Sequence, residues 1–147
     1  MSSQIHATCV ALPEGGVLLR GESGAGKSDL ALRLIDGGAR LVADDRTELT
    51  REDDRLIARA PASIAGLIEA RGMGILRLPP EKLAPEVAVV LIVDLVDAAI
   101  IERLPEAGRE ELLSVSLRCV ALAPFEASAP AKIRLALLAS ASTSSPP

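Results

Sequence analysis

Short runs of apolar residues, separated by turn-forming and charged residues, predict many strands and few helices. The predicted strands cover 5–12, 17–20, 41–43, 74–78, 87–93 and 112–122. Residues 48–60 have the pattern of a β-hairpin whose polar turn lies around 52–54. The run 87–93 is rich in valine and isoleucine, which is typical of a central strand that is buried on both faces.

Two segments carry helical spacing. Leucine, alanine and isoleucine recur about every three or four positions over 27–36, and Gly37 and Gly38 then supply a helix stop. A final helix is expected over 131–139. The segment 64–70 mixes both periodicities, so it is compatible with a short helix or with a helix-to-strand junction. The pattern therefore predicts an α/β domain with a mixed β-sheet.

Length and composition fit one globular domain. The chain has 147 residues, of which 49% are hydrophobic and 24% are charged, enough for a substantial core. We expect this domain to span 1–139, followed by a flexible tail over 140–147, where serine, alanine and proline accumulate. The run 87–93 is too short to span a bilayer, and the N-terminus does not have the pattern of a secretory signal. A cytoplasmic location is therefore expected.

Charge and aromatic content argue against nucleic acid and membranes as partners. The 16 basic and 20 acidic residues leave a formal net charge of -4, which offers no general attraction to nucleic acid or anionic lipid. Phe125 is the sole aromatic residue, so stacking along a single-stranded nucleic acid is not expected. Cys9 and Cys119 are too far apart for a metal-binding CxxC pair, and both are expected to be buried thiols.

Residues 21–28 match the phosphate-binding motif G-x-x-x-x-G-K-[ST] at every fixed position. They are Gly21, Glu22, Ser23, Gly24, Ala25, Gly26, Lys27 and Ser28. The glycines let successive backbone N–H groups surround an anion, and the following helix presents its positive end to the same anion. Lys27 can then reach the β- and γ-phosphates of ATP, while the Ser28 hydroxyl can coordinate Mg²⁺. A strand before the motif and a helix after it favour this function over a glycine-rich turn that binds nothing.

Two adjacent acids follow the predicted strand 41–43. If this strand runs parallel to 17–20, Asp44 and Asp45 emerge beside the glycine-rich loop, because ligands of α/β sheets bind at the carboxyl ends of strands. One carboxylate can accept the proton of an attacking hydroxyl while the other holds Mg²⁺. A solvated surface turn is the alternative. Asp94 also follows an apolar run, as in a Walker B strand, and periodicity alone does not distinguish the two positions.

The register of the first predicted hairpin places His6. If the first two strands pair about the turn 13–16, Leu12 pairs with Val17. The same register, extended, brings His6 opposite Ser23 in the glycine-rich loop. An imidazole there can hydrogen-bond a phosphate or a catalytic carboxylate. A slip in register would instead leave a strand histidine without a ligand.

The segment 69–74 combines a carboxylate, a guanidinium and two glycines. Glu69 and Arg71 share one face if the segment is extended. Gly72 and Gly74 permit close approach of another backbone or of a ligand. A carboxylate beside a guanidinium suits a site that holds both Mg²⁺ and phosphate. An exposed Glu–Arg pair beside a glycine-rich turn is the alternative.

Together these segments resemble the catalytic domain of the HPr kinase/phosphorylase family. The resemblance rests on His6 and on residues 21–32, 39–46 and 68–75, within about the first half of the chain. It implies a P-loop nucleotide-binding domain similar to the nucleotide domain of phosphoenolpyruvate carboxykinase. It also implies ATP- and Mg²⁺-dependent phosphorylation of a serine on HPr, the phosphocarrier of the phosphotransferase system. Many members also remove that phosphate with inorganic phosphate, releasing pyrophosphate.

The same resemblance implies roles for individual residues. Asp44 resembles the proton acceptor of the kinase direction and the proton donor of the reverse one, assisted by Asp45 and His6. Ser28 and Glu69 resemble the residues on the Mg²⁺ side of the site. Family members are commonly hexamers, so a homo-oligomer is expected.

Two features depart from the family pattern. The phosphate-binding motif begins at residue 21, so the chain resembles the short form of some α-proteobacteria, without the separate N-terminal domain of longer members. The basic C-terminal loop of the family is not matched, and 124–134 takes its place, with Lys132 and Arg134 as candidate substitutes. Arg71 lies in the family's signature segment and is the candidate for phosphate contact.

Three functions are compatible with these motifs. The first is a serine kinase, and also a phosphorylase, that acts on an HPr-like phosphocarrier. The second is a small-molecule kinase with the same phosphate-binding loop. The third is a nucleotide-sensing interaction module that binds ATP and a partner without turnover. The acid pair beside the loop favours an enzyme over the module.

Overall fold

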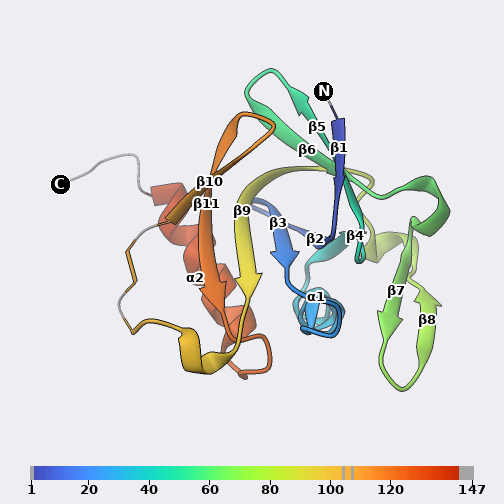
Figure 1. The fold of residues 1–147 in the computed structure, drawn as a ribbon. Helices are drawn as coiled ribbons and strands as arrows, with labels where there is room; N and C mark the ends of the chain where they lie inside the picture. Colours follow the sequence, from blue (N-terminus) through green and yellow to red (C-terminus); the bar gives the residue numbers. More distant parts are fainter. Residues whose placement is uncertain (1, 104, 107, 143–147) are drawn as a thin grey trace.

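The computed structural model describes residues 2–142 except 104 and 107, and it shows a curled, mixed β-sheet with two α-helices (Figure 1). One-turn 3₁₀ helices are labelled η. In chain order the elements are β1 (Ser2–Ile5), β2 (Ala7–Leu12), β3 (Gly15–Arg20), α1 (Lys27–Asp36), β4 (Arg40–Ala43), β5 (Thr47–Glu52), β6 (Arg55–Arg59), η1 (Ala62–Ile64), β7 (Leu67–Ala70), β8 (Gly74–Arg77), η2 (Pro80–Lys82), β9 (Val87–Leu95), η3 (Ala98–Ile100), β10 (Gly108–Leu112), β11 (Val115–Leu122) and α2 (Ala129–Ser142).

Three parallel strands form the centre of the sheet. β9 pairs in parallel with β3 on one side and with β11 on the other. Antiparallel strands extend this centre in three places. β2 and then β4 lie beyond β3, and β10 lies beyond β11. β6 pairs with the beginning of β9, and β5 and β1 follow β6. β9 curves visibly along its length in Figure 1, so the sheet curls. The β7–β8 hairpin forms a separate two-stranded sheet.

The strand order brings the two acids to the same sheet edge as the glycine-rich loop. β4 is antiparallel to β2, and β2 is antiparallel to β3, so β4 and β3 run in the same direction with β2 between them. The carboxyl ends of β3 and β4 therefore lie at one edge of the sheet. The loop 21–26 follows β3 and Asp44 follows β4, which confirms the predicted parallel direction.

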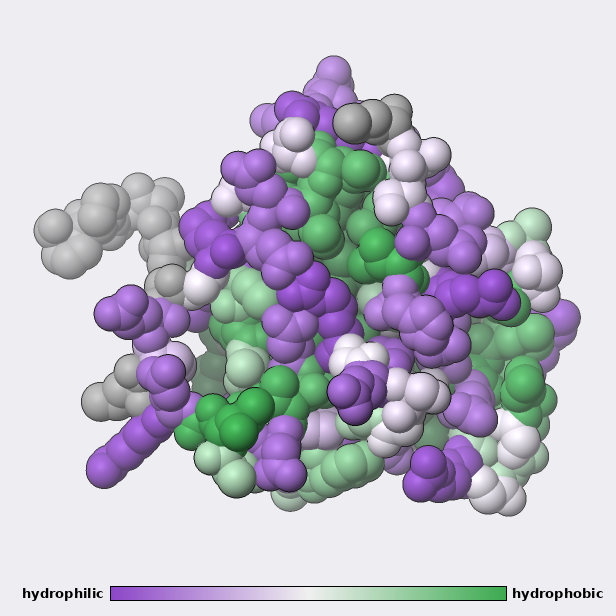
Figure 2. All heavy atoms as spheres, viewed as in Figure 1, coloured by the Kyte–Doolittle hydropathy of each residue, from purple (hydrophilic) through white to green (hydrophobic). Residues whose placement is uncertain are grey.

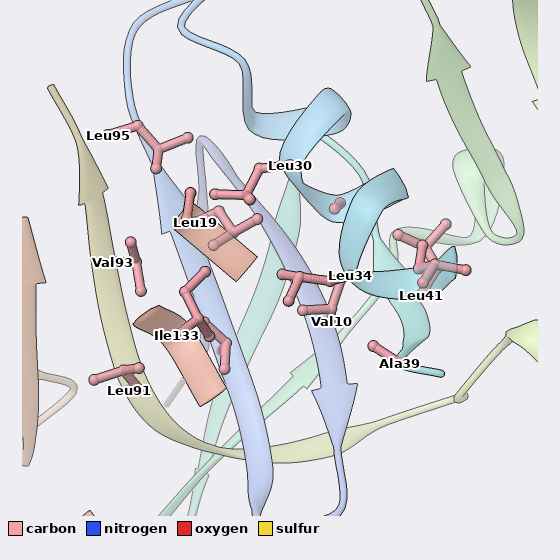
Figure 3. Packing of buried hydrophobic residues seen from close by; sticks show 14 of the residues in the cluster. Val10, Leu19, Leu30, Leu34, Ala39, Leu41, Leu91, Val93, Leu95 and Ile133 are labelled. Atoms are coloured by element: carbon pink, nitrogen blue, oxygen red, sulfur yellow. The ribbon is translucent and has the colours of Figure 1, made fainter. Parts of the chain in front are cut away.

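Alternating side chains cover both faces of the central strands. Leu19 of β3 and Leu91 and Val93 of β9 belong to the cluster that packs against Leu30 of α1 and Ile133 of α2 (Figure 3). Intervening residues such as Leu18 and Ile92 belong to a second cluster on the opposite face, which also includes residues of β5, β6 and β11. Burial on both faces explains the continuous apolar run predicted as the central strand.

Most predicted elements are confirmed, and the differences have local causes. The helix over 27–36 has the predicted bounds, and 64–70 is a junction between η1 and β7. β10 was not predicted, because three of its five residues are charged. α2 is longer than the predicted 131–139 and includes Ser140, the first residue of the predicted tail; 143–147 lie outside the described residues.

The predicted register of the first hairpin is wrong by two residues. Leu12 pairs with Gly15 rather than with Val17, so the turn consists of Pro13 and Glu14 only. Gly15 has a φ of +143°, and a Cβ there would lie 2.8 Å from a methyl of Val90, so the backbone needs a glycine at this position. Gly15 is therefore the first residue of β3, although glycine is also common in turns and was predicted to lie in one. His6 consequently lies in the break between β1 and β2 and is not opposite the loop residue predicted for it.

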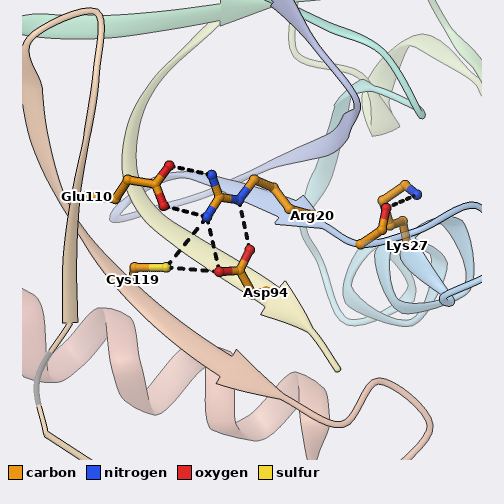
Figure 4. Close-up of polar contacts among 6 residues, drawn as sticks. Arg20, Lys27, Asp94, Glu110 and Cys119 are labelled. Carbon is orange, nitrogen blue, oxygen red and sulfur yellow. Dashed lines mark hydrogen bonds and ion pairs between the residues drawn. The ribbon is translucent and has the colours of Figure 1, made fainter. Parts of the chain in front are cut away.

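An arginine with two carboxylate partners joins the central strands (Figure 4). Arg20 of β3 donates to both oxygens of Asp94 on β9, at 2.8 and 3.0 Å, and to both oxygens of Glu110 on β10, at 2.6 and 2.7 Å. Asp94 therefore serves the structure of the sheet here. Cys9 is buried as predicted, but Cys119 is only partly buried, and its Sγ lies 3.3 Å from an Asp94 oxygen. Burial and that carboxylate raise the pKa of Cys119 to about 11.

The Arg20 cluster predicts a loss of stability in acid. Burial would raise the pKa of Asp94, but hydrogen bonds from Arg20 and Cys119 hold this pKa below its ordinary value. The hydrogen bond from Arg20 also lowers the pKa of Glu110. Carboxyls with a lowered pKa stabilise the folded state above their unfolded pKa of about 4, and this stabilisation is lost as the pH falls through the folded pKa.

We therefore expect urea unfolding to show a free energy that declines as the pH falls below about 4. In Arg20→Leu this decline should be smaller, because neither carboxylate keeps its cationic partner. Arg109→Leu is the matched control, since among the described residues Arg109 bonds to Ser116 and to no carboxylate, and its loss should leave the acid dependence unchanged. Equal acid dependence in Arg20→Leu and the wild type would contradict this assignment.

Candidate functional site

A cavity of about 580 Å³ is lined mainly by three separate segments of the chain. The segments are the glycine-rich loop with the start of α1, the residues that follow β4, and the β7–β8 hairpin. The polar side chains that line the cavity are Ser23, Lys27, Ser28, Asp29, Asp44, Asp45, Arg46, Glu69 and Arg71. The tertiary structure thus brings the predicted loop, the acid pair and the Glu–Arg segment together.

The loop has the backbone that its glycines permit. Gly24 and Gly26 have φ values of +83° and +100°, which disfavour residues with a Cβ. Gly26 is the residue that precedes α1, so the first N–H groups of this helix lie beside the loop. Lys27 is only 5% exposed, and its Nζ donates to the carbonyls of Gly21, at 2.8 Å, and Glu22, at 3.1 Å. These two hydrogen bonds hold the Lys27 ammonium against the first residues of the loop.

Asp44 is a buried carboxylate that accepts three hydrogen bonds. Its Oδ1 accepts from the hydroxyls of Thr8, at 2.9 Å, and Ser28, at 2.6 Å, and its Oδ2 accepts from the backbone N–H of Glu69, at 2.9 Å. The side chain is 8% exposed. Hydrogen bonds to a charged acceptor are stronger than neutral ones. Asp44 therefore fixes β2, α1 and β7 relative to one another.

Asp45 differs from its neighbour because its side chain is open to solvent. Its side chain is 56% exposed, and Oδ1 lies 3.6 Å from His6 Nδ1 and 3.9 Å from Lys27 Nζ. Its φ is +65°, a left-handed conformation that aspartate tolerates better than most residues. The N–H of Asp45 donates to Thr8 Oγ1 at 3.0 Å, which holds this turn against β2. The carboxylate thus lies between an imidazole and an ammonium at the cavity.

Glu69 and Arg71 enter the cavity wall from the β7–β8 hairpin. Glu69 is part of β7, whereas Arg71 lies in the turn beyond it, so the two residues are not on one continuous extended strand as predicted. Both nevertheless line the cavity. Among the described residues Arg71 has no ion-pair partner within 4.0 Å. Figure 2 shows hydrophobic side chains over this hairpin, where Met73 is 72% exposed.

Thr8 is a site residue without a sequence signal, and two basic residues expected near the substrate lie elsewhere. Thr8 is fully buried and joins both acids, but a threonine within an apolar strand carries no sequence signal of this role. Lys132 and Arg134 do not line the cavity. Lys132 pairs with Glu126 at 2.9 Å, and Arg134 donates to the carbonyl of Leu34 at the end of α1. Both lie on α2, which packs beside α1 in the same hydrophobic cluster.

The cavity has the oxygen ligands that Mg²⁺ prefers, but it does not have a complete metal cage. Within the described ranges, no group of three histidine, cysteine, aspartate or glutamate side chains could hold a metal ion. The Ser28 hydroxyl and the Asp44 carboxylate lie 2.6 Å apart, with Glu69 in the same wall. Mg²⁺ usually binds one or two carboxylates and completes its shell with water and substrate phosphates. This donor set therefore fits a Mg²⁺–nucleotide complex.

Fold and site together define a mixed α/β domain whose candidate site, a cavity with several charged side chains, lies at the carboxyl ends of β3 and β4. A family model, the HPr Serine kinase C-terminal domain, matches residues 1–126, and the chain belongs to this family. This result confirms the resemblance to HPr kinase/phosphorylase. None of the described helices is both long enough and apolar enough to span a membrane.

Known relatives and a solved structure agree with this membership. The HPr kinase/phosphorylase of Bacillus subtilis is 46% identical over 78 residues, which are 52% of this chain and 25% of that protein. That of Peptoclostridium acidaminophilum is 50% identical over 76 residues, 51% of this chain and 25% of that protein. These matches thus span a quarter of the length of the curated relatives. The structure of the Hpr(Ser) kinase/phosphatase from Coxiella burnetii matches with a TM-score of 0.81 and 28% identity, covering 90% of this chain and 92% of that chain.

Proposed function

We propose that this chain carries the catalytic site of a protein-serine kinase that uses ATP and Mg²⁺ to phosphorylate an HPr-like phosphocarrier. We propose further that the same site removes this phosphate by attack of inorganic phosphate, with release of pyrophosphate. The observation that carries the proposal is the convergence of Lys27, Ser28, Asp44 and Asp45 in one cavity. Family membership and the printed names of the relatives support the same activity.

The glycine-rich loop is proposed to hold the phosphates of ATP, as expected for a P-loop nucleotide-binding domain. Its N–H groups and the start of α1 offer donors and positive potential to an anion. The Lys27 ammonium would transfer its hydrogen bonds from the loop carbonyls to the β- and γ-phosphates. The reaction then depends mainly on positioning and on neutralising charge around the transferring phosphoryl group.

Ser28, Asp44 and Glu69 are the residues that would hold Mg²⁺. Asp44 already fixes the Ser28 hydroxyl at 2.6 Å and is held in turn by Thr8 and by the backbone of Glu69. When bound, Mg²⁺ supplies neutralisation of the negative charge on the phosphate oxygens. Arg71, exposed in the same cavity wall, is the proposed contact for the transferring phosphate.

We assign the proton acceptor to Asp45 rather than to Asp44. Asp44 lines the cavity but is only 8% exposed, and both of its carboxylate oxygens already accept hydrogen bonds. Asp45 is exposed to the cavity, so its carboxylate can accept the proton of the attacking serine hydroxyl. In the reverse direction the protonated Asp45 returns this proton to the serine oxygen. His6, 3.6 Å away, is a positioning residue for this carboxylate.

Transfer to a purified HPr-like phosphocarrier tests the proposal. The carrier would be incubated with ATP, Mg²⁺ and this protein, and mass spectrometry should then find one phosphoserine. Subsequent addition of inorganic phosphate should remove that group and release pyrophosphate. Phosphate that appears on small metabolites and never on the carrier would favour a small-molecule kinase. ATP binding without any product would favour a nucleotide-sensing module. The homo-hexamer stays a prediction, which sedimentation would test.

A further inference from the structure

A second cavity, of about 960 Å³, lies on the other side of the glycine-rich loop. Its walls are the loop itself, the segment 95–100 that follows β9, and the segment 123–126 that follows β11. A backbone hydrogen bond from Val96 to Leu122 joins the last two walls at 3.0 Å. The volume falls in the range of about 300–1,000 Å³ that is usual for small-molecule sites. Loop residues line this cavity too, but the side chains proposed for Mg²⁺ binding, proton transfer and phosphate contact do not: Lys27, Ser28, Asp44, Asp45, Glu69 and Arg71.

Phe125, the sole aromatic side chain of the protein, lies between the two cavities and lines both of them. Its side chain is 68% exposed. It nevertheless packs on the loop, because a Cβ built at Gly26 would lie 2.9 Å from the Cζ of the ring. An exposed phenylalanine beside a phosphate-binding loop has a large ring surface available to a ligand.

The backbone on either side of Phe125 is fixed to α1. Arg33 of α1 donates to the carbonyl of Pro124 and, at 3.2 Å, to the carbonyl of Glu126. Glu126 also accepts a hydrogen bond from Lys132 of α2 at 2.9 Å. In Figure 1 the loop that follows β11 lies between α1 and the η3 segment. The ring is therefore exposed but held on a fixed backbone, which lowers the entropic cost of stacking a ligand on it.

The electrostatics of the second cavity favour a neutral group over a further phosphate. Arg20 is the one basic residue among the described residues that line it, and both Asp94 and Glu110 already occupy its guanidinium. Glu22 and Asp97 add further carboxylates to the lining. Hydrophobic side chains complete the walls, and Figure 2 shows such side chains gathered over the segment that follows β9.

The proposed kinase function sets the direction of a bound nucleotide. The reacting γ-phosphate must lie beside Ser28, Asp44 and Asp45, in the first cavity. The nucleoside must then lie on the opposite side of the loop from these acids. In the sheet, β4 lies on one side of β3 and β9 and β11 lie on the other, so this is the side of β9 and β11. Because both strands are parallel to β3, their carboxyl ends meet at the crevice where ligands of α/β sheets bind.

We propose that the second cavity holds the nucleoside of the bound nucleoside triphosphate and that its base stacks on Phe125. This inference rests on the proposed function, since the phosphates determine which side faces the nucleoside. A single aromatic ring is enough to stack on one base, whereas binding of a nucleic acid strand uses several such rings. Stacking of a base on an aromatic side chain contributes roughly 1–3 kcal/mol, which corresponds to roughly fivefold to a hundredfold in affinity.

Calorimetric titration of Phe125→Leu with two ligands tests this site. Leucine keeps an apolar contact with Gly26 but cannot stack, so the affinity for Mg²⁺–ATP should fall roughly tenfold. The affinity for Mg²⁺–tripolyphosphate, which has no nucleoside, should be unchanged. Leu135→Ala is the matched control, since Leu135 is 64% exposed on α2 and lines neither cavity. It should bind both ligands as the wild type does.

Phe125→Trp gives a second and independent measurement. The natural chain has no tryptophan, so the variant has a single indole signal. This fluorescence should change when ATP is added and stay constant with tripolyphosphate, and the ATP affinity should be retained. Equal losses for both ligands in Phe125→Leu would overturn the inference, because the ring would then only support the loop. An indole signal that does not respond to ATP would also overturn it.

The same measurements separate the nucleoside site from the kinase function. If Phe125→Leu weakens ATP binding selectively but the wild type never phosphorylates a carrier, the nucleoside site stands and the proposed function fails. If the wild type binds tripolyphosphate as tightly as ATP and phosphorylates the carrier, the function stands and the nucleoside site fails. If the wild type binds neither ligand, both proposals fail.

Discussion

Asp45→Asn is expected to reduce phosphoryl transfer about a hundredfold to ten-thousandfold, with little change in nucleotide affinity. The amide is nearly isosteric with the carboxylate but cannot accept the serine proton, and general bases contribute an effect of this size. Asparagine also tolerates the left-handed backbone of this residue, whose φ is +65°. The measurement is the single-turnover rate of carrier phosphorylation at saturating ATP and Mg²⁺, together with the dissociation constant of ATP.

Asp53→Asn is the matched control for this variant. Asp53 also has a positive φ, of +58°, and lies in the turn between β5 and β6, outside the cavity lining. Its replacement should leave the rate unchanged. Neither variant should change the free energy of unfolding by more than about 0.5 kcal/mol, because both residues are exposed. A normal rate in Asp45→Asn would remove Asp45 from the chemistry and return the role of proton acceptor to Asp44.

Asp44→Asn is expected to impair both stability and the use of Mg²⁺. All three contacts to Asp44 come from donors, namely Thr8, Ser28 and the N–H of Glu69. An amide presents one oxygen and one NH₂ group, so at least one of these partners must reorient or lose its acceptor. A buried group left without its hydrogen-bond partner costs about 1–3 kcal/mol, and we expect a loss of stability of this size.

Catalysis by Asp44→Asn should depend strongly on the Mg²⁺ concentration. The lost negative charge beside Ser28 should lower transfer on the order of a hundredfold at limiting Mg²⁺, and excess Mg²⁺ should restore part of the rate. Glu110→Gln is the control, because Glu110 also accepts charged hydrogen bonds but lines neither cavity. It should lower stability without changing the Mg²⁺ requirement. A Mg²⁺ dependence in Asp44→Asn equal to that of the wild type would contradict the metal role.

Asp44 and Asp45 are adjacent in the sequence but have different surroundings, because a tight turn begins directly after β4. Asp44 directly follows β4 and is buried, and its backbone carbonyl accepts from the N–H of Arg46 at 2.7 Å. The tight turn forces Asp45 into the left-handed region and away from the buried side. One carboxylate is therefore held among donors while the next is open to the cavity. In a regular strand, adjacent side chains point to opposite faces of the sheet, so only one of the two carboxylates would face the glycine-rich loop. The turn allows both carboxylates to line the cavity.

Several features of the site could be predicted because their signals are local. The glycine-rich loop, the following helix and its stop at Gly37 and Gly38 depend on backbone conformations that few residues other than glycine adopt. Hydrophobic spacing identified β9 and α1 for the same kind of reason. The position of His6 could not be found this way, because a two-residue change in the turn moved the register of the whole hairpin.

Other features depend on contacts between segments that are distant in the sequence. Thr8 meets Asp44 across 36 positions, and Arg20 meets Glu110 across 90 positions. A threonine in an apolar strand and a glutamate in a charged hairpin look ordinary by themselves. In the sequence Phe125 is notable only because the protein has no other phenylalanine, tyrosine or tryptophan. Its position against Gly26 is visible only in the structure.

By itself, the sequence determined the kinds of element, the phosphate-binding motif and the candidate chemistry of this protein. These follow from periodicity and from backbone conformations set within a few neighbouring residues. The tertiary structure decided which acid is buried and which is open, where the histidine lies, and that two cavities flank one loop. The physical reason is that burial and hydrogen-bond geometry depend on strand order and register. Both are set by packing over the whole sheet rather than by any single segment.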